Sequence, residues 1–110
     1  MTSLSTHVLD AVAGAPAAGL ALVLTDAGGN LLASAVTDAD GRARLAEDLP
    51  PGTCRLRFAT GEWFAAAGRE AFYPEVVVAF TAAPVDAGGR AHLHVPLLLS
   101  PFAYSTYRGS

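Results

Sequence analysis

The sequence predicts an all-β sandwich or barrel, formed as one domain over residues 1–110. Short apolar segments alternate with turn-forming residues at intervals of about 8–15 residues, which is typical of such folds. The length suits a single hydrophobic core. Hydrophobic residues make up 52% of the chain, more than a small domain usually buries, so we also expect a buried subunit interface.

Six strands are expected. They cover Leu4–Ala11, Leu20–Thr25, Leu31–Thr37, Thr53–Ala59, Glu75–Thr81 and Ala91–Leu99. The stretches GAPAAG, DAGGN, DADGR, PPG and DAGG separate them and supply the residues that turns require. The fourth strand has two clear faces, because Cys54, Leu56 and Phe58 alternate with Arg55 and Arg57.

One stretch, GEWFAAAGREAF, favours a helix instead. Its alanines are good helix formers, Glu62 lies near its start, Arg69 lies near its end, and Pro74 follows. We expect a short helix over Glu62–Gly68, with an extension to Ala71 left open.

Charge and composition exclude several functions. The net charge is −3 without a block of like charge, which argues against a nucleic-acid partner. No apolar run approaches the roughly 18–20 residues that span a membrane. The single Cys54 suits a reducing compartment, and the start MTSLSTHVLD lacks the features of a secretory signal. A cytoplasmic location is therefore expected.

The three histidines all fall on expected strands, and His92 and His94 share a face because they are two residues apart. His7 shares a face with Ser5 and Leu9. If the first and last strands are neighbours, the three imidazoles converge. Three interpretations stay open at this point: hydrogen-bonded structural histidines, a zinc site with one open position, and general acid–base catalysis.

Other motifs point to turns. TDADGR partly matches a calcium loop, but Val36 would be its first ligand and no helices flank it, so a turn that presents Arg42 is favoured. DAGGN and DAGGR lack the ending of a phosphate loop. There is no G-x-S-x-G motif, and Cys54 lies on an apolar face, so a Ser or Cys nucleophile has little support.

Three segments together resemble the 5-hydroxyisourate hydrolase family, the transthyretin-related enzymes of urate breakdown. They are LSTHVLDAVAGAPA at the start, TDADGR in the middle and HLHVPLLLSPFAYSTYRGS at the end. The similarity extends from about Leu4 to Ser110 and includes FYPEVVVAF. The final YRGS is the most specific part, because transthyretin proper lacks it.

The resemblance implies a transthyretin-like sandwich of two mostly antiparallel sheets with one short helix. It implies a homotetramer, assembled as a dimer of dimers, with active sites in the channel between the dimers. The implied reaction is hydrolysis of 5-hydroxyisourate to 2-oxo-4-hydroxy-4-carboxy-5-ureidoimidazoline, with no cofactor. The implied catalytic residues are His7, Arg42, His94 and Ser110, and the implied substrate-binding residues are His92, Tyr107, Arg108 and Gly109. Leu93 and Trp63 depart from the residues common in the family, which puts the shape of the pocket in doubt.

Two other functions are weighed against hydrolysis. A transthyretin-like carrier would bind a small aromatic ligand in the channel, but a passive channel needs neither the two histidines nor the arginine. A purely structural sandwich leaves the YRGS tail unexplained. The family reaction implies no metal, so zinc held by the three imidazoles is expected to be adventitious.

Overall fold

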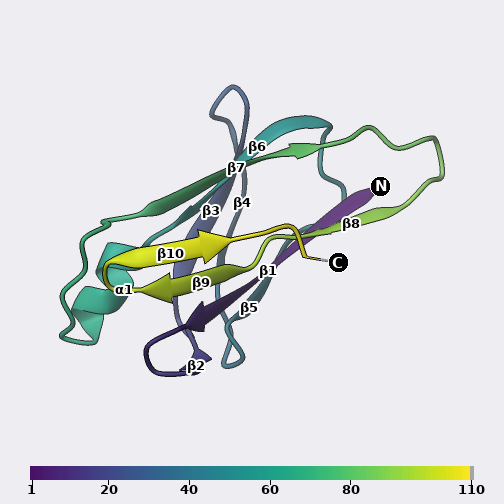
Figure 1. The fold of residues 1–110 in the computed structure, drawn as a ribbon. Coiled ribbons are helices and arrows are strands. Elements are labelled where there is room, and N and C mark those ends of the chain that lie inside the picture. The colour runs from purple at the N-terminus through teal and green to yellow at the C-terminus, as the bar shows by residue number, and fades with distance from the viewer. Residues whose placement is uncertain (110) are drawn as a thin grey trace.

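The computed structural model describes residues 1–109 and forms a sandwich of two β-sheets with one short helix (Figure 1). The first sheet contains β10 (Ala103–Thr106), β9 (Leu97–Ser100), β1 (Thr2–Asp10), β2 (Ala15–Pro16), β5 (Arg42–Ala46) and β8 (Ala91–His94). The second sheet has the order β4 (Leu31–Val36), β3 (Ala21–Asp26), β6 (Gly52–Phe58) and β7 (Val76–Ala82). The predicted two-sheet sandwich is confirmed.

Strand β1 organises the first sheet, because every other strand of this sheet except β10 pairs with it. It is antiparallel to β2 and β5, and parallel to β8 and β9. The parallel pairs place the first strand beside segments about ninety positions later in the sequence. The expectation that the first and last strands are neighbours is therefore confirmed.

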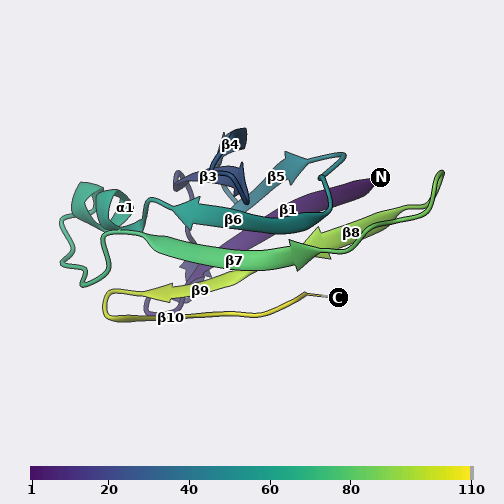
Figure 2. The same cartoon turned by 90° about the horizontal axis from the view of Figure 1, so that it is seen from above.

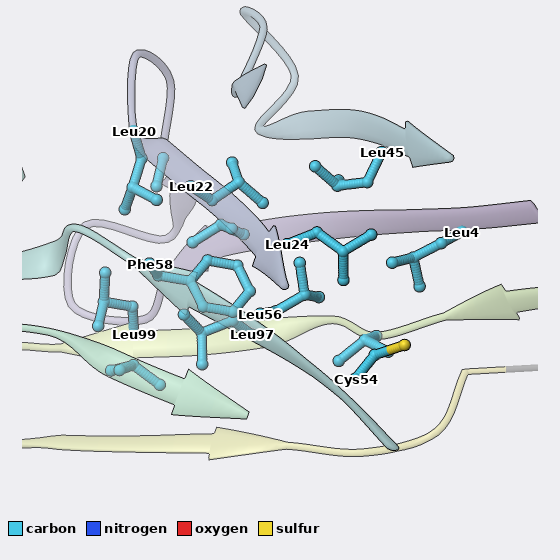
Figure 3. Packing of buried hydrophobic residues seen from close by; sticks show 14 of the residues in the cluster. Leu4, Leu20, Leu22, Leu24, Leu45, Cys54, Leu56, Phe58, Leu97 and Leu99 are labelled. Carbon is cyan, nitrogen blue, oxygen red and sulfur yellow. The ribbon is translucent and has the colours of Figure 1, made fainter. Parts of the chain in front are cut away.

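The core lies between the two sheets (Figure 3). Along β1, buried and half-exposed residues alternate without a break. Its buried members Leu4 and Val8 meet Leu22, Leu56 and Leu97, which are also buried, from other strands. One face of β1 therefore belongs to the core, and the other is free to carry a site.

The predicted last strand, Ala91–Leu99, is wrong as a single element. It divides into β8 and β9, because Pro96 lacks the N–H that a continuous ladder requires. Three strands were missed, one of them the two-residue β2. Strand β5 follows directly after its turn and buries only Leu45, while β10 is exposed throughout, so neither shows a clear apolar alternation.

Helix α1 (Thr60–Ala66) begins two residues earlier than predicted and ends before Gly68. Gly68, with φ +68°, donates its N–H to the Ala65 carbonyl, and Arg69 donates its N–H to the Phe64 carbonyl. These two bonds close the helix in a Schellman motif, so the extension to Ala71 is wrong. Figure 2 shows α1 at one end of the sandwich and the β7–β8 connection at the other. Within residues 1–109, no helix has the length and apolar character needed to cross a membrane.

Candidate active site

The outer face of β1 carries the candidate site. His7 is paired with Arg42 of β5 in the antiparallel register, and Ser5 is paired with His94 of β8 in the parallel register. Residues paired across neighbouring strands project from the same face of a sheet. Three of the predicted catalytic residues therefore meet on the face of the first sheet that points away from the core.

A tight turn fixes Arg42 at the start of β5. The Asp38 carboxylate accepts hydrogen bonds from the N–H groups of Asp40 and Arg42, at 2.9 and 3.0 Å. Gly41 has φ +75°, and a Cβ at this position would collide with the Val8 carbonyl oxygen. The N–H of Val8 donates to the Gly41 carbonyl at 2.7 Å. The prediction of a strand-connecting turn is confirmed, and this turn is docked directly on β1.

The C-terminal tail returns to His94. After β10, the Thr106 hydroxyl donates to the Pro96 carbonyl at 2.7 Å, and the Gly109 N–H donates to the His94 carbonyl at 2.8 Å. A Cβ at Gly109 would lie 2.6 Å from Cδ2 of the His94 ring. Only a glycine lets the tail approach the ring this closely. Ser110, the remaining predicted catalytic residue, lies outside the described residues.

Two serines that the sequence prediction did not include lie between the histidines. The Ser5 hydroxyl lies 2.8 Å from Nε2 of His92 and 2.9 Å from Nδ1 of His94. The Ser3 hydroxyl lies 2.5 Å from Nδ1 of His92. The two-residue period of β1 already places Ser3 and Ser5 on the face of His7, so this signal was present in the sequence.

The surroundings of His94 disfavour its protonation. Burial lowers the pKa of the His94 imidazole below its usual value, and the charges of His7, His92 and Arg42 lower it further. A neutral imidazole at neutral pH has one free nitrogen that accepts a proton. In contrast, burial raises the pKa of the Cys54 thiol, which suits a residue of the core.

Metal binding was one of the open interpretations of the histidines. Across residues 1–109, no three His, Cys, Asp or Glu side chains are close enough together to hold a metal ion.

Two cavities border His94. One, of about 230 Å³, is open toward the outer face and is lined by Ser5, Thr6, Asp38, Arg42, Ala43, Arg44 and His94. The other, of about 380 Å³, lies between β7 and the tail, and Tyr107 and Arg108 line it together with His94. The predicted substrate-binding residues are therefore divided: Tyr107 and Arg108 lie beside the larger cavity, Gly109 lies against the His94 ring, and His92 is exposed and lines neither cavity.

Sequence similarity identifies the family of the chain. The sequence model of the HIUase/Transthyretin family matches residues 4–109. The chain belongs to this family. Among its relatives, the 5-hydroxyisourate hydrolase of Caulobacter vibrioides is 46% identical over 119 aligned residues, with 100% of both chains covered.

Solved structures of this family share the fold. The 5-hydroxyisourate hydrolase of Klebsiella pneumoniae superposes with a TM-score of 0.86 at 42% identity, covering 98% of this chain and 99% of that one. Sea bream transthyretin in complex with thyroxine superposes with a TM-score of 0.87 at 34% identity. The match covers 96% of this chain and 93% of the transthyretin chain. The predicted transthyretin-like fold and the resemblance to the hydrolase family are both confirmed.

Proposed function

We propose that this protein is a 5-hydroxyisourate hydrolase. It opens the six-membered ring of 5-hydroxyisourate to give 2-oxo-4-hydroxy-4-carboxy-5-ureidoimidazoline in urate breakdown. One observation carries the proposal: His7, Arg42 and His94 occupy one face of the first sheet, in a chain that matches hydrolases over its full length.

The residue types suit the reaction. Hydrolysis of a cyclic acyl–nitrogen bond needs a base for the attacking water, an acid for the departing nitrogen and positive charge near the developing oxyanion. His7 and His94 share the two proton transfers, and the lowered pKa of His94 keeps its imidazole available as a proton acceptor at neutral pH. The permanently charged guanidinium of Arg42 binds the substrate and stabilises the oxyanion.

The tail contributes the remaining contacts. Tyr107 and Arg108 bind substrate from the side of the larger cavity, Gly109 holds the His94 ring in place, and His92 lies beside it. Ser110 supplies a hydroxyl that orients water or substrate. The reaction uses no cofactor.

A second candidate is a carrier of a small aromatic ligand. The likeness to a thyroxine-bound transthyretin favours it. Against it stands the polarity of the outer face, where β1 and β8 carry two serines and three histidines beside Arg42. A channel that holds an apolar ring does not require these groups.

The assembly proposed is a cytoplasmic homotetramer, a dimer of dimers with the sites between dimers. Several large apolar side chains remain exposed on the single chain, including Leu31, Val36, Phe102, Tyr104 and Tyr107. The proposed subunit contacts would cover some of these side chains, which are otherwise exposed to water. Light scattering coupled to size-exclusion chromatography is expected to give four times the chain mass of 11.2 kDa; a monomer would contradict the assembly.

The activity is tested by generating 5-hydroxyisourate from urate with urate oxidase and following its optical decay. Untagged protein is expected to accelerate this decay, and the acceleration is expected to persist in the presence of a chelator. Decay at the spontaneous rate, from folded tetrameric protein, would favour the carrier instead.

A further inference from the structure

A continuous row of hydrogen bonds joins four side chains on the outer face of the first sheet. Ser3 contacts Nδ1 of His92, Nε2 of His92 contacts Ser5, and Ser5 contacts Nδ1 of His94. The row begins at Ser3, passes through the exposed ring of His92 and ends at the half-buried ring of His94. Ser5 is its central member, because it alone touches both imidazoles.

We infer that Ser5 is a positioning residue, which holds the rings of His92 and His94 in the same tautomer and passes protons between them. The role in catalysis rests on the proposed hydrolase function. The coupling of the two tautomers rests on geometry alone and does not require that function.

The single proton of a hydroxyl favours this coupling. A serine hydroxyl has one proton to donate and two lone pairs that accept. Among residues 1–109 the Ser5 hydroxyl has only these two ring nitrogens as partners, so its proton is hydrogen-bonded in the row only when Ser5 donates to one ring and accepts from the other. When both rings are neutral, each carries one N–H, so in such an arrangement the state of either ring determines the state of its partner.

Two arrangements satisfy every bond and also use the Ser5 proton, whereas a third, in which Ser5 accepts from both rings, leaves that proton without a partner in the row. In the first, His94 Nδ1–H donates to Ser5, Ser5 donates to His92 Nε2, and His92 Nδ1–H donates to Ser3. In the second, Ser3 donates to His92 Nδ1, His92 Nε2–H donates to Ser5, and Ser5 donates to His94 Nδ1. Both rings carry the proton on Nδ1 in the first arrangement and on Nε2 in the second.

The first arrangement gives the Ser3 proton a second partner. In it Ser3 accepts from His92 Nδ1–H and directs its own proton to the Ala91 carbonyl, a long contact of 3.5 Å, and we take it as the resting arrangement. Nε2 of His94 is then unprotonated and acts as a proton acceptor. This assigns His94 the part of the base at the start of the reaction.

The row also removes the proton that His94 takes from water. As Nε2 of His94 gains a proton, its Nδ1 proton passes to Ser5, the Ser5 proton passes to His92 Nε2, the His92 Nδ1 proton passes to Ser3, and the Ser3 proton leaves to solvent. One proton enters and one leaves, no electron moves, and the row ends in the second arrangement. His94 then carries Nε2–H and donates it to the departing nitrogen as the row runs in reverse, with one proton from solvent entering at Ser3 and the Ser5 proton returning to His94 Nδ1.

The charges around His94 favour this export. His7 lies on β1, Arg42 and Arg44 lie on β5 with Asp38 in the turn before it, His92 lies on β8, and Arg108 lies on the tail. Among the described residues, the carboxylates of this group are Asp38, which accepts backbone N–H groups, and Glu47, which is paired with Arg44 at 2.6 Å, so the uncompensated charges are Arg42 and Arg108. The net field is positive, so a second proton is not retained on the His94 ring.

The first test is nuclear magnetic resonance of the ring nitrogens of wild-type protein at a pH where both imidazoles are neutral. The chemical shifts of nitrogen-15 distinguish Nδ1–H from Nε2–H in each ring. His92 and His94 are expected to share one tautomer, which becomes independent in Ser5→Ala. Different tautomers in the two rings of the wild type would refute the coupling whether or not the protein hydrolyses 5-hydroxyisourate.

The second test is kinetic. Ser5→Ala is expected to lower kcat about 10- to 100-fold with little change in KM, and to shift the acid limb of the kcat–pH profile. Ser5→Thr, which keeps the hydroxyl, is expected to restore most of kcat. Ser34→Ala, a matched exposed serine on β4 of the other sheet, is expected to behave as the wild type.

A double-mutant cycle separates a relay from simple packing. His92→Ala is expected to lower kcat, and Ser5→Ala combined with His92→Ala is expected to lose no more than the larger single loss, because either change breaks the same row. Full additivity, a loss confined to KM, or a Ser5→Thr variant as slow as Ser5→Ala would overturn the inference.

Discussion

At the scale of single residues, His94 connects three parts of the site. Its ring contacts Ser5 of β1, its carbonyl accepts the N–H of Gly109 from the tail, and it borders the same cavity as Arg42. Removing the ring therefore removes a proton-transfer group while leaving the backbone contacts in place.

The first prediction concerns this ring. His94→Asn is expected to lower kcat about 10²- to 10⁴-fold, the usual contribution of a general acid–base group, while the proposed tetramer and the thermal midpoint change little. Steady-state kinetics and light scattering on the same sample measure both. Turnover close to that of the wild type would exclude a catalytic role for His94.

The second prediction concerns Gly109. Gly109→Ala is expected to displace the His94 ring and to lower kcat about tenfold or more, because its Cβ has no room beside Cδ2. The matched control is Gly28→Ala in an exposed turn, where the nearest atom is the flexible amide of Asn30 at 3.3 Å. Equal activity of the two variants would show that the tail tolerates a side chain at Gly109.

Some of these residues were predictable from strand periodicity. Because side chains alternate along a strand, His7 and Ser5 were expected on one face of the first strand, and His92 and His94 on one face of the last. The pairing of Ser5 with His94 was not predictable, because the register between distant strands is set by the whole core and not by local sequence. Arg42 was singled out from its turn, but its place opposite His7 depends on β5, which the sequence did not reveal.

At the scale of elements, the Asp38–Gly41 turn determines where Arg42 lies. It combines a left-handed glycine with a close approach to β1, and these two requirements are separable by mutation.

The third prediction separates them. Gly41→Ala is expected to destabilise the fold by about 1–3 kcal/mol or more, because an unfavourable φ is combined with a collision with Val8. Gly29 has a similar φ of +83°, but a Cβ there would have no atom within 4 Å. The stability lost in Gly29→Ala therefore measures the cost of the backbone conformation alone. Urea denaturation measures both. If the two variants lose equal stability, the turn is not docked on β1 as described.

The fold was largely predictable at this scale, with informative exceptions. Strands such as β3 and β6 alternate buried and exposed residues, and their positions were confirmed. Strand β10 is polar and exposed and is held by its pairing with β9, so its own sequence carries little signal. Hydrophobic periodicity detects burial, and it fails where pairing alone maintains a strand.

At the scale of the whole molecule, one ion pair ties the first sheet to the helical end of the sandwich. Arg69 donates to the buried carboxylate of Asp10 at 2.6 Å, and its guanidinium lies 4.8 Å from the centre of the Phe64 ring. Asp10 also accepts the N–H groups of Val12 and Ala13.

The fourth prediction is a pH dependence of stability. The hydrogen bond from Arg69 lowers the pKa of Asp10, and the bonds from the two N–H groups lower it further. The stabilisation is complete above the usual aspartate pKa of about 3.9 and is lost as pH falls through the lower value of the folded state. Asp10→Asn is therefore expected to be less stable by about 1–2 kcal/mol at pH 7 and to lose less stability on acidification.

Urea denaturation at several pH values tests this, with Asp26→Asn as control. Asp26, the last residue of β3, also accepts backbone N–H groups, and the side chain of Asn30 lowers its pKa, but within residues 1–109 it has no ion pair, so the difference between the two variants isolates the contribution of Arg69. An Asp10→Asn curve that parallels the wild type down to pH 3 would contradict the assignment.

The parallel pairing of β1 with β8 has a consequence for how the protein folds. Ser3 and Ser5 meet histidines 87 to 89 positions away along the chain. Closing so long a loop costs conformational entropy before any contact compensates for it, and non-local pairing of this kind slows folding. The face that carries the candidate site therefore forms only when β8 pairs with β1, so a chain in which only β3 and β6 are paired would lack it. Recovery of the proposed activity during refolding would then report the closure of this long loop.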